Sequence, residues 1–201
     1  MSALELAEAG NVMAALAALQ RAERRDPDVA QIAFLEGNMF GRLGRFDEAA
    51  RALERTVALN PRFAGARFKL ALARLRLGQA DRAAAALEQV VHDRPDDFRA
   101  WHNLAAIAYS RGDIDRAEQL ERKALGIHRD YAEGWNTLGA IYLMRRQPAA
   151  AVDALNVATR LAPRNAQAFH NLSLALRALD QPEPAKHAAA TACSIDTQYC
   201  H

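Results

Sequence analysis

The sequence predicts an all-α protein built from helix pairs that repeat every 34 residues. Glycine, proline and alanine recur in one register, and each period contains two stretches with apolar residues at helical spacing. The composition agrees with this fold class, because aromatic residues make up only 6% of the 201 residues while alanine is abundant. Small side chains suit the close approach of helices better than they suit strands.

The 34-residue interval is kept by three residue types that have distinct structural roles. Pro27, Pro61 and Pro95 follow it, and Pro163 comes two periods later. Four glycines keep the same interval: Gly10, Gly44, Gly78 and Gly112. Six alanines keep it without a break: Ala15, Ala49, Ala83, Ala117, Ala151 and Ala185. Proline ends a helix, glycine accepts the positive φ of a helix-terminating turn, and alanine lets paired helices cross closely.

Two amphipathic segments occupy each period. In residues 98–131, a first stripe is formed by Trp101, Leu104, Ala105 and Ala108, at i, i+3, i+4 and i+7. The tripeptide RGD at 111–113 interrupts it, and a second stripe begins at Ala117. Proline at 148, 182 and 184 fits the first turn of a helix. The period therefore predicts two antiparallel helices joined by a short turn.

The segment 135–142 reads W-N-T-L-G-A-I-Y, with Ala151 and Pro163 after it, and it resembles the tetratricopeptide repeat. The resemblance covers nearly the whole chain. It implies a right-handed superhelical solenoid of antiparallel helix pairs, forming a single domain over 1–201. We expect a partial repeat at 1–29 and five full repeats at 30–63, 64–97, 98–131, 132–165 and 166–199.

Some positions depart from the family pattern. Glu36, Arg67 and Arg74 stand where large apolar residues are usual. Because an unpaired buried charge is costly, we expect Glu36 to pair with Arg67 or Arg74. The alternative is that these charges reach a partner. Arg146 and Asp180 replace the turn glycine in the last two repeats, which makes those turns harder to predict.

Charge and apolar patterning exclude several classes of protein. The net charge is +2, from 26 basic and 24 acidic residues, which is too balanced for a general nucleic-acid binder. No apolar run is long enough to insert into a membrane. Residues 1–10 contain Glu5 and Glu8 and have no basic segment, so they do not resemble a signal peptide. These features favour the cytoplasm, with the periplasm as the alternative if a signal segment has been removed.

Nothing in the sequence points to catalysis, a cofactor or a metal. The six histidines are scattered, and no nucleophile, phosphate-loop or zinc-protease motif appears. Cys193 and Cys200, with His201, match no metal motif. We expect the two thiols to be unpaired, and a local disulfide is the alternative. The chain is therefore predicted not to be an enzyme.

The resemblance also implies a concave groove lined by the first helix of each repeat. Mapped onto this sequence, the groove positions that carry binding chemistry are Asn38, Arg42, Lys69, Arg76, Arg99, His102, Asn103, Tyr109, Asn136, His170, Asn171 and Arg177. Arg42, Lys69, Arg76 and Arg99 form a basic stretch that suits an acidic peptide or a free carboxylate. The amides and imidazoles could hold an extended backbone, because an amide both donates and accepts. Thr137 interrupts the asparagine ladder between Asn103 and Asn171.

These observations predict a scaffold or adaptor that binds an extended, acidic segment of a partner protein in the groove. The same positions are also those expected of a solvated face, and Phe34, Phe68 and Tyr109 could serve either a partner or the core. The match to the chaperone-binding clamp of the family is only partial, so chaperone tails are not predicted ligands. Two alternatives remain: a recognition domain of a larger multidomain enzyme, and a module that self-associates through its terminal repeats.

Overall fold

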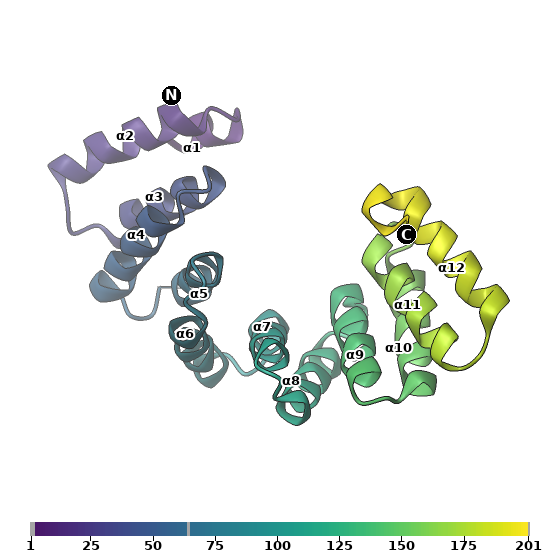
Figure 1. The fold of residues 1–201 in the computed structure, drawn as a ribbon. Helices are drawn as coiled ribbons and strands as arrows, with labels where there is room; N and C mark the ends of the chain where they lie inside the picture. Colours follow the sequence, from purple (N-terminus) through teal and green to yellow (C-terminus); the bar gives the residue numbers. More distant parts are fainter. Residues whose placement is uncertain (1–2, 64, 201) are drawn as a thin grey trace. The chain divides into compact units, whose positions relative to one another are not determined.

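The computed structural model describes residues 3–63 and 65–200, and every regular element in those ranges is helical (Figure 1). The helices divide into two compact units, Met1–Arg94 and Pro95–His201. The predicted fold class, an all-α array of antiparallel helix pairs, is confirmed. Each unit is described by itself below.

Unit 1 contains three successive helix pairs. Their bounds are α1 Ala3–Glu8, α2 Val12–Arg25, α3 Ala30–Arg42, α4 Phe46–Leu59, α5 Ala66–Arg76 and α6 Ala80–Asp93. The helices α3 and α5 are the first helices of their repeats, and α4 and α6 are the second. The helix α4 contacts both α3 and α5, so neighbouring pairs share one apolar layer.

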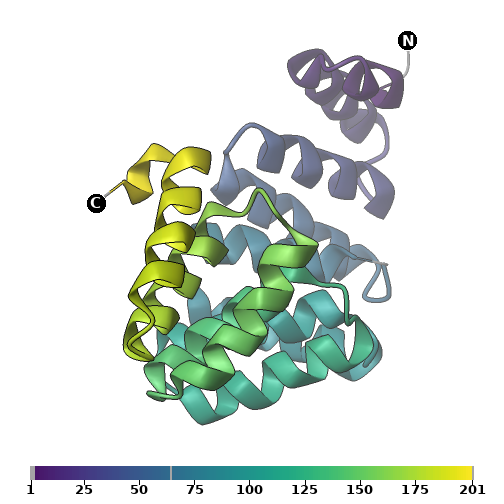
Figure 2. The ribbon, with the colours of Figure 1, turned by 90° about the vertical axis from the view of Figure 1, so that its right-hand side faces the viewer.

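Unit 2 contains three further pairs. Their bounds are α7 Phe98–Ser110, α8 Ile114–Ile127, α9 Ala132–Met144, α10 Pro148–Leu161, α11 Ala166–Ala178 and α12 Pro182–Ile195, followed by a 3₁₀ turn at Thr197–Tyr199. The first helices α7, α9 and α11 contact one another in order. In both ribbon views α9 to α12 lie side by side, coloured green to yellow (Figures 1 and 2). As predicted, Pro148 and Pro182 begin helices.

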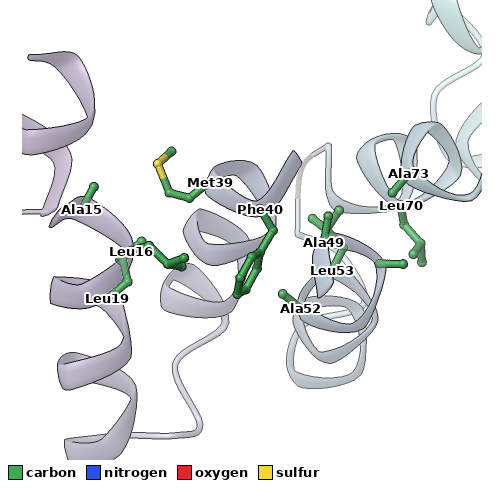
Figure 3. Close-up of a cluster of buried hydrophobic side chains, with 11 residues drawn as sticks. Ala15, Leu16, Leu19, Met39, Phe40, Ala49, Ala52, Leu53, Leu70 and Ala73 are labelled. Carbon is green, nitrogen blue, oxygen red and sulfur yellow. The ribbon is translucent and has the colours of Figure 1, made fainter. Parts of the chain in front are cut away.

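The core of unit 1 is a layer of small and branched apolar side chains. Leu16 and Leu19 of α2, Phe40 of α3 and Leu53 of α4 are 9% exposed or less (Figure 3). The register alanine Ala49 is 1% exposed and lies in the same cluster. The predicted role of the alanines follows from this burial: a larger side chain at such a position would push the paired helices apart.

The last two turns keep the glycine geometry without glycine. Gly112 has a φ of 78°, while Arg146 and Asp180 each have a φ of 56°. An L-residue pays a steric cost in this left-handed region. Each turn is closed by a backbone hydrogen bond, from the Gln147 amide to Tyr142 and from the Gln181 amide to Leu176, both near 3.0 Å. The turn geometry is therefore set by the helix-terminating hydrogen bonds rather than by the residue type.

The expected partner of Glu36 is wrong. Glu36 is 3% exposed, and Arg55 of α4 donates to its carboxylate from Nη2 at 3.0 Å. Arg55 also binds Glu23 of α2, so one guanidinium joins three helices. Arg74 instead pairs with Glu54 at 2.9 Å, and Arg67 pairs with Asp93 at 3.3 Å. A charge pair between neighbouring helices is confirmed, but the cation that pairs with Glu36 is Arg55 rather than Arg67 or Arg74.

The expectation of unpaired thiols is also wrong. Cys193, near the end of α12, forms a disulfide with Cys200, which follows the 3₁₀ turn. The bond joins residues seven positions apart and ties the chain after α12 back to that helix. Of the described helices, none has both the length and the apolar character that a membrane span requires.

Candidate binding faces on the first helices

Six polar side chains line the N-terminal halves of three neighbouring first helices in unit 2. We call them the polar row: His102 and Asn103 on α7, Asn136 and Thr137 on α9, and His170 and Asn171 on α11. They occupy the fifth and sixth positions of their repeats, so the 34-residue register brings them to the same level of successive helices. The helices contact each other in that order, which makes the row continuous within the unit.

Two amides join the row across helices. Asn171 donates from Nδ2 to Oδ1 of Asn136 at 2.9 Å. Asn136 is 9% exposed, so this bond satisfies an acceptor that is largely removed from water. Asn103 donates from Nδ2 to the carbonyl oxygen of Arg99 at 2.7 Å, within its own helix. The asparagines are thus held in fixed orientations, and Asn171 pairs with Asn136 rather than continuing a simple ladder.

His102 is fixed by a carboxylate from the core. Its Nδ1 lies 2.9 Å from Oε2 and 3.1 Å from Oε1 of Glu121, a residue of α8 with no exposed surface. The Tyr131 ring meets the imidazole edge-on, with centroids 5.0 Å apart. Burial raises the pKa of Glu121, and the hydrogen bond from His102 opposes that rise. Burial, followed by the nearby Glu133, raises the pKa of Tyr131 to about 12.

Glu121 was missed by the sequence analysis, although the register contained a signal for it. The equivalent position of other repeats holds Leu53, Leu87 and Leu155. A glutamate at a fully buried leucine position needs a partner, because an uncompensated buried carboxylate is costly. His102 supplies it from the fifth position of the same repeat. Comparing equivalent positions between repeats would have shown Glu121 as the exception among leucines, although not its partner.

The other predicted residues of unit 2 lie at the edges of this face. The rings of His170 and Tyr199 are 5.0 Å apart, so the segment after α12 covers part of α11. Arg99 is exposed beside Asp97, with Nε 3.5 Å from Oδ1. Tyr109 is half-buried, and Arg177 is exposed in the last turn of α11. Met144 and Leu174, further along their helices, are 60% and 40% exposed and give this end an apolar character.

Unit 1 carries most of the predicted basic stretch on α3 and α5. Lys69 places its ammonium 5.9 Å from the centroid of the Phe34 ring. Arg76 is exposed, and among the described residues its guanidinium has no partner. Arg42 forms a hydrogen bond within the protein, donating from Nη1 to the carbonyl oxygen of Ala7 at 3.1 Å. Asn38 has a buried Oδ1 that accepts no hydrogen bond from the described residues.

The predicted basic stretch is therefore divided between the two units. Arg42, Lys69 and Arg76 belong to unit 1, whereas Arg99 belongs to unit 2. Phe34 packs against the core cluster and against Phe63, with ring centroids 4.7 Å apart. These contacts within the protein account for the burial of Phe34, so no bound partner protein is needed to explain it. Within the described ranges, histidine, cysteine and carboxylate side chains form no group of three that could hold a metal ion.

The amino-acid sequence matches models of a known protein family. Three family models, each described as a tetratricopeptide repeat, match residues 1–61, 42–107 and 100–130. The chain belongs to the tetratricopeptide repeat family. The W-x-x-L-G-x-x-Y segment at 135–142 repeats the same pattern beyond the matched residues. No curated protein sequence shows a significant match to the chain.

Solved structures with tetratricopeptide folds resemble most of the chain. PilF of Pseudomonas aeruginosa has a TM-score of 0.84 at 15% identity, covering 97% of this chain and 89% of its own. The Cut9–Hcn1 hetero-tetramer of the APC/C has a TM-score of 0.81 at 19% identity, covering 97% of this chain. This chain spans only 39% of the matched Cut9–Hcn1 chain. YrrB, described as having an unusual peptide-binding site, has a TM-score of 0.70 at 14% identity, covering 91% of this chain and 94% of its own. At these identities the likeness establishes the fold alone.

Proposed function

We propose that the chain is a protein-binding scaffold that holds an extended segment of a partner on its first helices. The observation that carries this proposal is the polar row of α7, α9 and α11. Two of its side chains are oriented by contacts inside the protein: His102 by Glu121, and Asn171 by Asn136. Groups fixed before binding lose little conformational entropy when a ligand arrives, so they favour recognition.

The chemistry of the row suits a peptide backbone. An extended strand presents amide donors and carbonyl acceptors at regular intervals, and asparagine offers both kinds of group. After its bond to Arg99, the Asn103 side chain keeps its Oδ1 as an acceptor. Exposed Met144 and Leu174 add apolar contacts further along the same helices. This combination holds a backbone by hydrogen bonds and leaves sequence preference to the flanking side chains.

A preference for acidic segments is proposed from unit 1. Lys69 and Arg76 both lie on α5 and are exposed. Arg76 has no partner within the described chain, so its guanidinium is available for a bidentate carboxylate contact. Lys69 lies close to the Phe34 ring, which limits the volume that its ammonium explores.

Binding should depend on the α5 cations. Peptides selected from a random display library on the wild-type protein are expected to be acidic. Lys69→Glu/Arg76→Glu should weaken their binding by about tenfold or more, because attraction becomes repulsion. Fluorescence anisotropy at fixed ionic strength measures the change.

A matched control separates this effect from net charge. Arg51→Glu/Arg82→Glu makes the same charge change on second helices α4 and α6, where both side chains are exposed. Its affinity should stay close to that of the wild type. An equal loss in both double variants, or no loss in either, would contradict binding at the α5 cations.

The compartment is proposed from the cysteines. Disulfides persist in oxidising compartments and are rare in the cytosol. The Cys193–Cys200 bond therefore supports the periplasmic alternative over the cytoplasm. The alternatives for function are a recognition domain of a larger enzyme and a module that self-associates through its terminal repeats. The binding experiment tests the first, and light scattering over a concentration series tests the second.

A further inference from the structure

A pocket lies on the opposite side of α9 from the polar row. An open pocket of about 610 Å³ is formed between the second helices α8 and α10, with α9 as its floor. Trp135, Leu138 and Tyr142 provide the floor, and they lie on the face of α9 turned away from Asn136 and Thr137. Volumes of this size are typical of ligand sites. The pocket belongs entirely to unit 2.

A comparison with the preceding repeat explains why this pocket is open. Trp101 and Trp135 are equivalent, and each donates from its indole nitrogen to a backbone carbonyl, of Pro95 at 2.8 Å and of Arg129 at 2.7 Å. The Trp101 ring is covered by Lys123, whose Nζ lies 4.4 Å from the ring centroid. The position equivalent to Lys123 is Val157, whose short side chain lines the pocket without a charged end.

The side chains that form the walls of the pocket are also small in this repeat. Gly126 of α8 and Ala150 of α10 line the pocket. Within unit 2, the positions equivalent to them hold Arg160 and Arg116. The apolar floor and its aromatic ring are thus left uncovered because three positions around the pocket, Val157, Gly126 and Ala150, carry small or short side chains. Aromatic and branched side chains of a partner would bury most surface here.

The rim determines which partner fits. Arg129, in the turn after α8, is exposed, and its guanidinium has no partner among the described side chains. Arg122 is already bound, from Nε to Glu118 at 2.9 Å and from Nη2 to the Tyr142 hydroxyl at 2.7 Å. Asp153 of α10 lines the opposite wall and is exposed. The α8 side therefore favours a carboxylate, and the α10 side disfavours one.

We propose that this Trp135 pocket docks a partner segment carrying an aromatic side chain beside one acidic residue. The ring enters the pocket above Trp135, and the carboxylate pairs with Arg129. The site is independent of the polar row and of the α5 cations, so it does not require the proposed function above to be correct.

The probe is the blocked peptide Gly-Asp-Phe-Gly-Gly, added to the ¹⁵N-labelled full chain. The indole N–H signals of the two tryptophans are assigned with Trp→Phe variants, and Trp101 serves as the internal control. We expect the Trp135 signal to move and the Trp101 signal to stay. Gly-Asp-Ala-Gly-Gly should leave both unmoved, and Gly-Lys-Phe-Gly-Gly should bind more weakly.

Two variants test the pocket itself. Val157→Lys restores the cover found over Trp101 and should weaken peptide binding by about tenfold or more. Arg129→Glu, in an exposed turn, should reverse the preference between the acidic and basic peptides. Val157→Leu and Arg160→Glu are the matched controls, and both should bind as the wild type does.

Three results would overturn the proposal. The first is a Trp135 signal that does not respond to the phenylalanine peptide, or that responds equally to the alanine peptide. The second is unchanged binding in both Val157→Lys and Arg129→Glu. The third is a Trp135 signal that moves with protein concentration alone, with a dimer seen by light scattering, because a second copy would then be the occupant.

Discussion

Replacing Arg55 with methionine is expected to lower the free energy of unfolding by about 3 kcal/mol at pH 7, because it leaves a buried carboxylate without its cation. Glu36 is 3% exposed and receives one hydrogen bond from Arg55, while its Oε1 has no partner in the described chain. Methionine keeps the aliphatic part of the side chain, so the loss measures the charge rather than the packing. Urea unfolding followed by circular dichroism gives the value.

The defect should depend on pH. Burial already raises the pKa of Glu36. Because Arg55 donates a hydrogen bond to this carboxylate, we expect its removal to raise the pKa further. A carboxyl group whose pKa is higher in the folded protein stabilises the fold when protonated, and loses that contribution as the pH rises through its folded pKa. The deficit of Arg55→Met should therefore be largest at pH 7 and shrink as the pH falls toward about 4.5.

Two further variants test the cause. Arg55→Met/Glu36→Leu places the usual leucine at position 36 and should recover most of the lost stability. Lys186→Met removes the cation of an exposed pair with Glu183 and should change nothing measurable. The account of the buried pair fails if the double variant is less stable than Arg55→Met, or if the loss is independent of pH.

Gly139→Ala is expected to destabilise unit 2 by about 2 kcal/mol, even though alanine is the better helix former. A Cβ at position 139 would lie 2.5 Å from Cγ and 2.7 Å from Cδ2 of Leu155, a side chain with no exposed surface. The closest contact is with Cγ of Leu155, the branch point of the side chain, so rotation of the Leu155 methyl groups about the Cβ–Cγ bond cannot relieve the clash. Leu155→Ala should cost about 3 kcal/mol by leaving a cavity.

The two changes should compensate. In Gly139→Ala/Leu155→Ala the new methyl group occupies part of the vacated space, so the double variant should lose at least about 1 kcal/mol less than the sum of the single variants. Urea unfolding at one pH measures all three. Strict additivity would show that α9 and α10 do not cross closely at this point.

The repeat positions predicted the fold because each is tied to one local requirement. The register alanines mark helix crossings, and Ala15, Ala83 and Ala151 are fully buried. Arg146 and Asp180 were harder to assign, because hydrogen bonding imposes the turn where the residue type does not favour it. The prediction of unpaired cysteines is wrong because their spacing of seven residues does not give the distance between the two sulfur atoms. That distance depends on the path of the chain after α12.

Pairing between side chains was less predictable than the fold. Arg55 lies in a second helix, and only the structure shows that its side chain reaches both Glu23 and Glu36. The predicted groove residues fall on first helices as expected, but neither their pairing, such as Asn171 with Asn136, nor the division into two units follows from the register. Side-chain contacts depend on helix rotation, which a repeat pattern determines only to within a residue.

The most direct test of the proposed scaffold function is the response of the side-chain amide signals of Asn103, Asn136 and Asn171 to a selected acidic peptide. These three NH₂ groups report on the polar row itself, and single Asn→Asp variants assign them in a ¹⁵N spectrum. We predict that the signals of Asn103 and Asn171 move in proportion to the bound fraction, while that of Asn165, in the turn before α11, does not. A peptide that binds with all three row signals unmoved would contradict binding on the α7, α9 and α11 face.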